Sequence, residues 1–148
     1  MTKSLLYYVF IISISFLYVW TEPEILRVLS VLTGMVFITY SFFHLLDLAR
    51  FKKSHVKYNY VAKAFPRYSM IQLILYFIFG ILYLIGYNVF IVSLVAFPFI
   101  AMNLHSAGRE VPFMKTDTDM FDMMFIQRSV IDNIILNILI VVILFVSL

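Results

Sequence analysis

Five long runs of uncharged, mostly apolar residues constrain this chain more than any other feature. The runs extend over Leu5 to Trp20, Val28 to Leu46, Tyr68 to Tyr87, Val89 to Leu104 and Asn133 to Leu148. About 20 helical residues cross a hydrocarbon core of about 30 Å, and about 17 suffice with help from flanking residues. The runs lack the alternation typical of a membrane β-barrel. Each run is therefore predicted to be a membrane-spanning helix.

The composition excludes a water-soluble enzyme. Apolar residues make up 64% of the chain and charged residues 13%, whereas a soluble domain has about 45–50% and about 25%. The chain has no cysteine, so thiol nucleophiles, Cys-ligated zinc and iron–sulfur clusters are excluded as well. We therefore expect an all-α integral membrane protein, a helical bundle of five transmembrane helices.

The runs divide the chain into two parts. Residues 1–27 are predicted to form an N-terminal transmembrane helix and a short outer loop. Residues 28–148 are predicted to form a four-helix membrane domain, with a basic cytoplasmic loop at 50–67 and a second cytoplasmic loop at 105–128. A cleaved signal peptide is the alternative for the first run. A retained helix is favoured, because the run ends without the small-x-small pattern that cleavage needs.

Positive charge is concentrated between the runs. Six of the eleven Lys and Arg residues lie from Arg50 to Arg67, and Arg109, Lys115 and Arg128 follow the fourth run. The positive-inside rule places both segments in the cytoplasm, with the N-terminus, and leaves the C-terminus in the periplasm. The net charge of +3 then reflects orientation and contact with anionic lipid. We expect no nucleic-acid partner.

The basic segment has a helical pattern of its own. Apolar and aromatic residues recur every three or four positions before Pro66, and lysines fall mainly between them. This pattern indicates an amphipathic helix at the membrane interface. A solvated connector is the equally weighted alternative. The apolar positions are Phe51, His55, Tyr58, Ala62 and Phe65, and the predicted lipid or interface contacts are Lys52, Lys53, Lys57 and Lys63.

Polar groups near the ends of the runs are the candidate sites, because each needs a partner in the membrane. His44 and Asp47 are three residues apart and would share a helical face. Such a pair suits proton relay, or metal binding together with His105. Simple contacts with headgroups, water and each other are the favoured interpretation. We expect no metal site in the acidic segment from Thr116 to Asp122, which lacks the Gly and the terminal Glu of a calcium loop.

A second polar stripe opens the fifth run. Asp132, Asn133 and Asn137 span little more than one helical turn. Their amide and carboxyl groups are predicted to hold helices together, which needs no ligand. Motifs for phosphate binding, zinc hydrolysis or serine hydrolysis are absent from the sequence. We therefore assign no catalytic residue and no cofactor.

An ordered series of motifs begins at Gly34. Residues 34–51 read GMVFITYSFFHLLDLARF, residues 58–63 read YNYVAK, residues 79–86 read FGILYLIG and residues 130–133 read VIDN. Their order over roughly residues 34–148 resembles the DoxX/MauE family of small bacterial membrane proteins. The resemblance implies a four-helix membrane bundle. It also implies a role beside thiol redox chemistry or in the maturation of a periplasmic electron-transfer enzyme.

The chain departs from the family pattern at two places. Phe113-Met114-Lys115 stands where the family has Cys-x-Cys, and His44 stands where relatives often have Lys. Thiol–disulfide oxidoreductase activity is therefore excluded. A weaker similarity links residues 98–104 and 118–121 to the cornichon cargo adaptors.

These observations favour a noncatalytic accessory or assembly subunit of the bacterial inner membrane. Its predicted partners are the lipid bilayer and a larger membrane protein, such as a redox or electron-transfer complex. A quinone-linked or proton-relay protein using His44, Asp47 and His105 is the alternative from the redox class. A cornichon-like cargo adaptor is the third hypothesis.

Overall fold

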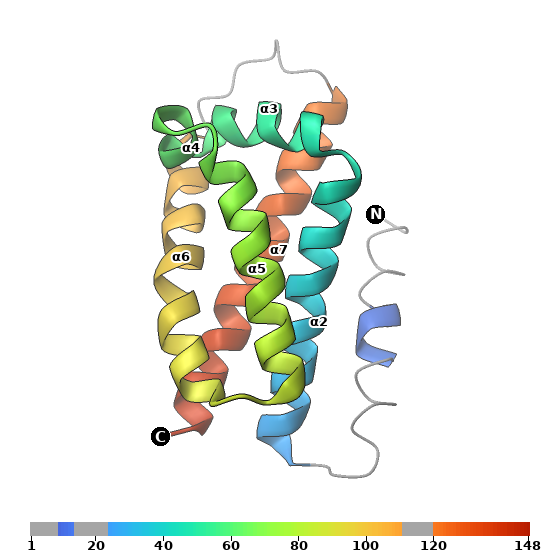
Figure 1. Cartoon of the computed structure of the whole chain (residues 1–148), viewed down its shortest axis with the longest axis vertical. Coiled ribbons are helices and arrows are strands. Elements are labelled where there is room, and N and C mark those ends of the chain that lie inside the picture. Colours follow the sequence, from blue (N-terminus) through green and yellow to red (C-terminus); the bar gives the residue numbers. More distant parts are fainter. Residues whose placement is uncertain (1–8, 14–23, 111–119) are drawn as a thin grey trace.

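The described part of the chain is a bundle of four long helices closed at one end by two short ones. The computed structural model describes residues 9–13, 24–110 and 120–148. Figure 1 shows the long helices running along the length of the molecule and α3 lying across one end. The long helices are α2 (Ile25–Leu46), α5 (Tyr68–Ile85), α6 (Val89–Glu110) and α7 (Met120–Val146), and the short ones are α3 (Leu48–Tyr58) and α4 (Tyr60–Ala64).

All four long helices are apolar enough to cross a membrane. The last four predicted spans therefore correspond to helices of the structure, which confirms a multi-pass protein, and the described residues are all-helical, without a strand. The first predicted span lies mostly outside the described residues. Only residues 9–13 of it are described; they are helical, and Ile11 packs in the same apolar core as Val36.

The second predicted loop is shorter than its sequence indicated. Helix α6 extends to Glu110 and α7 begins at Met120, so both helices reach into the predicted loop at 105–128. Hydropathy detects only the apolar part of a helix. The third and fourth turns of α7 carry Arg128, Ser129 and Asp132, and the last two of these are buried inside the bundle.

Among the described helices, α2 and α5 pack against each other most extensively. Gly34 and Gly80 leave no side chain between the two backbones: a Cβ atom on Gly34 would lie 2.8 Å from the Gly80 carbonyl oxygen. On either side of this contact, Ser30 donates to the Tyr83 carbonyl at 2.6 Å, and Ser41 donates to the Leu73 carbonyl at 3.1 Å. Small residues allow such an approach between membrane helices.

The tight turn between α5 and α6 follows the predicted hairpin. Gly86 ends α5 in the left-handed region with φ of 73°, where glycine is favoured. The backbone N–H of Tyr87 donates to the Leu82 carbonyl at 3.0 Å, which closes the helix end. Pro98 lies inside α6.

Helices α3 and α4 occupy the predicted amphipathic segment, so the helical alternative is confirmed. Phe51 and His55 are fully buried beneath α3, whereas Lys52 and Lys53 are exposed. The helix is interrupted at Asn59, whose side chain accepts from the backbone N–H of Val61 at 2.9 Å and caps α4. This break turns the following residues, and the predicted apolar position Phe65 is 70% exposed.

Candidate functional site

A network of buried polar side chains lies at the end of the bundle that α3 covers. Its seven members are each at most 3% exposed. They come from α2, α3, α5, α6, α7 and the α3–α4 junction, so the network joins all four long helices to α3. We call the following residues the end network: Tyr40, Tyr58, Asn59, Tyr76, Asn103, Ser129 and Asn133.

One branch of the end network centres on Ser129. The hydroxyl oxygen of Ser129 lies 2.8 Å from the hydroxyl oxygen of Tyr40 and 2.7 Å from that of Tyr58. A serine hydroxyl has one donor and two acceptor positions, so it can serve both tyrosines at once. This single side chain of α7 thereby links α2 and α3.

The other branch is a chain of amides and one phenol. The Asn59 amide donates to Asn103 Oδ1 at 2.7 Å, and the Asn103 amide donates to the Tyr76 hydroxyl at 2.8 Å. Tyr76 in turn donates to Asn133 Oδ1 at 2.7 Å, and Asn133 donates to the Ser129 carbonyl at 2.7 Å. Both branches therefore end at residue 129.

Two buried histidines flank the end network. His44 Nδ1 lies 2.7 Å from the Tyr40 carbonyl, and His55 Nδ1 lies 2.8 Å from the Ser69 hydroxyl. The Phe51 ring lies between the two imidazoles, 4.6 Å from His44 and 4.9 Å from His55 between centroids. Neither Nε2 atom has a hydrogen-bond partner. Both imidazoles are therefore packed against aromatic rings, with Nδ1 hydrogen-bonded and Nε2 buried without a hydrogen bond.

Burial fixes the protonation of the α3 side chains. It lowers the pKa of His55 to about 3, and the nearby His44 acts in the same direction. Burial raises the pKa of Tyr58 to about 12, although its hydrogen bond to Ser129 opposes the shift. At neutral pH, His55 is therefore uncharged and Tyr58 keeps its proton, so neither brings a charge into the bundle.

The predicted His44–Asp47 pair does not form. Asp47 lies beyond the end of α2 with φ of −132° and ψ of 61°, so the spacing rule for helical faces does not apply to it. Its carboxylate instead caps α3 by accepting from the Arg50 backbone N–H at 3.2 Å, and it lies 3.3 Å from the Arg50 guanidinium. His105, the proposed third member, is exposed on α6.

The predicted stripe at the start of the fifth run is better placed. Asn133 is a member of the end network, and Asp132 is 1% exposed and close enough to interact electrostatically with Tyr40 and Tyr58. Asn137 is partly buried, one turn further along α7. Sequence reasoning missed Ser129, although its spacing of four residues from Asn133 places both on one helical face.

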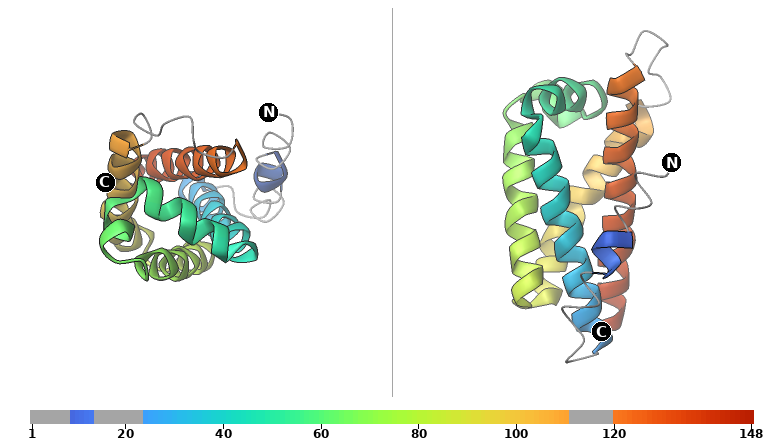
Figure 2. Two further views of the ribbon diagram at one scale, coloured as in Figure 1. Left: turned by 90° about the horizontal axis from the view of Figure 1, so that it is seen from above. Right: turned by 90° about the vertical axis from the view of Figure 1, so that its right-hand side faces the viewer.

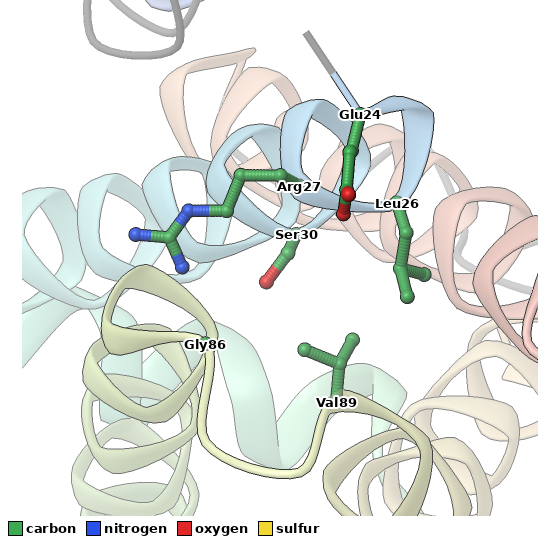
Figure 3. Close-up of a pocket in the computed structure, with 6 residues that line it drawn as sticks. All are labelled: Glu24, Leu26, Arg27, Ser30, Gly86 and Val89. Carbon is green, nitrogen blue, oxygen red and sulfur yellow. The ribbon is translucent and has the colours of Figure 1, made fainter. Parts of the chain in front are cut away.

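Two cavities lie away from the end network. One of about 140 Å³ opens at the opposite end of the bundle, between the start of α2 and the α5–α6 turn (Figure 3). It is lined by Glu24, Leu26, Arg27, Ser30, Gly86 and Val89. The other, of about 200 Å³, is wholly aliphatic and is lined by Ile11, Ile12, Leu32, Val36, Ile135 and Leu139.

The site has no arrangement typical of a metal centre. Within residues 9–13, 24–110 and 120–148, no three His, Cys, Asp or Glu side chains gather in a way that would hold a metal ion. No family model matches the chain, and no curated protein or solved structure matches it. The resemblance to the DoxX/MauE family therefore rests on its motifs alone.

Proposed function

We propose that this chain is a noncatalytic, DoxX/MauE-like accessory or assembly subunit of a larger membrane complex. The end network carries the proposal. Most of its hydrogen bonds join one helix to another, and its members do not line either of the two cavities described above. Hydrogen bonds between buried polar groups stabilise one arrangement of the helices. An accessory subunit needs such a fixed arrangement, because its partner binds to the outer surface of the helices.

The sizes of the cavities support the same role. Small-molecule sites have volumes of about 300–1,000 Å³, whereas the two cavities described here measure about 140 and 200 Å³. Neither is lined by a residue of the end network. The buried polar groups therefore stabilise the fold of the subunit, and the partner binds to the outer surface of the helices within the membrane.

We place the chain in the bacterial inner membrane with five spans. In this topology the N-terminus and the α3 end face the cytoplasm, and the C-terminus faces the periplasm. The basic residues from Arg50 to Arg67 gather at the α3 end. The opposite end carries Glu24, Arg27 and the uncharged turn at residues 86–88. This asymmetry agrees with the positive-inside rule.

Gentle extraction followed by native mass analysis tests the subunit role. The full chain, carrying an affinity tag, is expressed in its own host, extracted in a mild detergent and weighed. We expect a heteromeric species that contains a larger membrane protein. The same extraction of an unrelated tagged membrane protein serves as control for carry-over. A strictly monomeric, partner-free species would contradict the proposal.

A proton-relay protein is the second candidate, because one observation favours it. The Tyr58, Ser129 and Tyr40 hydroxyls form a continuous chain beside the buried Asp132. Groups that both donate and accept can pass a proton along such a chain. In vesicles containing the protein, Tyr58→Phe should then abolish proton flux, while Tyr87→Phe, at the exposed far turn, should not. Equal flux in both variants excludes the relay.

A further inference from the structure

Helix α3 lies at the level that lipid headgroups occupy. It runs across the end of the bundle, over the ends of the membrane-spanning helices (Figure 1), and the view down the bundle shows it covering that end (Figure 2). Helix α3 follows α2 directly and is joined to α5 through α4. Helices α2 and α5 have 22 and 18 residues, which is long enough to span the hydrocarbon core. The outer side of α3 is therefore at the interface between hydrocarbon and water.

Residues 48–67, which include α3 and α4 at this end of the bundle, contain exposed cations and no acidic residue. Lys52 and Lys53 are exposed on α3, and Arg67 is exposed just before α5. No Asp or Glu occurs from residue 48 to residue 67. Asp47, just before α3, is paired with Arg50, and Glu110 and Asp122 belong to the end of α6 and the start of α7. We call Lys52, Lys53 and Arg67 the cap cations.

Two of the cap cations, Lys52 and Lys53, belong to α3, which is fixed to the bundle. Tyr58 bonds to Ser129 of α7 at 2.7 Å, and His55 bonds to Ser69 of α5 at 2.8 Å. Because these bonds and the buried Phe51 fix the inner side of α3, the lysines next to Phe51 must point outward. The backbone that carries these lysines is therefore held in one position on the bundle, unlike that of a flexible basic tail.

Aromatic side chains accompany the charges. Tyr60, at the start of α4, is 42% exposed, and Phe65, just after α4, is 70% exposed. Aromatic rings are enriched where membranes meet water. A surface that exposes Phe65 together with lysines suits a lipid interface better than a purely aqueous partner.

We propose that the cap cations bind the phosphate groups of anionic phospholipids, and that α3 with α4 is a lipid-recognition surface of this protein. Charge complementarity and the interfacial level of α3 support this occupant. Each lysine near an anionic membrane surface strengthens binding to that surface through electrostatic attraction. The proposal concerns the lipid alone and holds whichever membrane partner the subunit has.

Lipid retention by the full chain tests the proposal. The protein is purified in a mild detergent with a mixture of phosphatidylglycerol and phosphatidylcholine, and bound lipids are counted by native mass spectrometry. We expect selective retention of phosphatidylglycerol. In the double variant Lys52→Gln/Lys53→Gln, the ratio of bound phosphatidylglycerol to bound phosphatidylcholine should fall roughly tenfold or more.

A charge-preserving variant separates binding from folding. Lys52→Arg/Lys53→Arg should retain phosphatidylglycerol as the native chain does, and both double variants should unfold at the same temperature in phosphatidylcholine alone, because the two side chains are exposed. Competition with inorganic phosphate distinguishes a lipid surface from a free-phosphate site: phosphate should not displace the lipid. Equal retention of phosphatidylglycerol by the glutamine variant, or displacement by millimolar phosphate, would overturn the proposal.

Discussion

Gly34 of α2 and Gly80 of α5 lie in backbone contact where the two helices cross. A Cβ atom on Gly34 would lie 2.8 Å from the Gly80 carbonyl oxygen, and one on Gly80 would lie 3.0 Å from the Gly34 carbonyl oxygen. Lipid tails are as apolar as the side chains, so close packing of this kind drives association of membrane helices. The crossing therefore depends on two residues that have no side chain.

Replacing Gly34 by alanine is expected to destabilise the bundle. The new methyl group would meet a backbone carbonyl, which cannot rotate away as a side chain can, so α2 and α5 must move apart. Overpacking of this kind costs about 1–3 kcal/mol. Thermal unfolding of Gly34→Ala in detergent, followed by circular dichroism, should show a lower midpoint than the native chain.

Gly108 provides the matched control for this substitution. It lies in α6, and a Cβ atom there would meet nothing within 4 Å. Alanine has the higher helix propensity by about 0.5–1 kcal/mol, so Gly108→Ala should unfold at the same temperature as the native chain or higher. If Gly34→Ala were as stable as Gly108→Ala, the importance of the crossing would be refuted.

Removing the Ser129 hydroxyl is expected to be costly. Ser129→Ala leaves the hydroxyls of Tyr40 and Tyr58 buried without their shared partner, and an unsatisfied buried group costs about 1–3 kcal/mol. Ser147→Ala is the control, since Ser147 lies just after α7 and its hydroxyl bonds to the Ile143 carbonyl four residues earlier. Denaturant unfolding should show the larger loss for Ser129→Ala; equal losses would show that the shared hydroxyl is dispensable.

The membrane-spanning helices were predictable because their lengths follow from the thickness of the bilayer. The predicted starts at Tyr68 and Val89 coincide with the starts of α5 and α6. The start of α7 was not predictable in the same way, because Asp122, Arg128 and Asp132 interrupt the apolar pattern before residue 133. Asp132 and Ser129 face inward there, and hydropathy cannot tell an inward polar residue from a loop residue.

The candidate site was only partly predictable. Asn133 stood out because an amide in an apolar run needs a partner. Tyr40 did not, because interface tyrosines and network tyrosines look alike in sequence, and its partner Ser129 is 89 residues away. Asp47 was predicted to share a helical face with His44, but α2 ends at Leu46, just before Asp47.

Acid is expected to weaken the bundle through His55. Its ordinary pKa of 6.5 falls to about 3 in the folded chain because the ring is buried. Between these values the unfolded chain binds a proton at His55 that the folded chain does not. The free energy of unfolding should therefore decrease as the pH falls from about 6.5 toward about 3, by at most about 1.4 kcal/mol per pH unit from this group.

Unfolding measured at a series of pH values checks the contribution of His55. His55→Gln should flatten the dependence of stability on pH in this window, because the substituted side chain does not titrate. His105→Gln, at an exposed position of α6, is the matched histidine substitution, and the flattening should be larger in His55→Gln. An unaltered slope in His55→Gln would assign the acid sensitivity to other groups.

The absence of cysteine makes the proposed topology directly measurable. Lys53 and Tyr87 are exposed at opposite ends of the bundle, so Lys53→Cys and Tyr87→Cys each place a single thiol in a chain that otherwise has none. A membrane-impermeant maleimide added to intact spheroplasts should label only Tyr87→Cys, and both variants after permeabilisation. The reverse pattern would move the cap cations to the periplasmic leaflet. It would leave the end network unchanged, because those hydrogen bonds join helices to one another and do not depend on which side of the membrane they face.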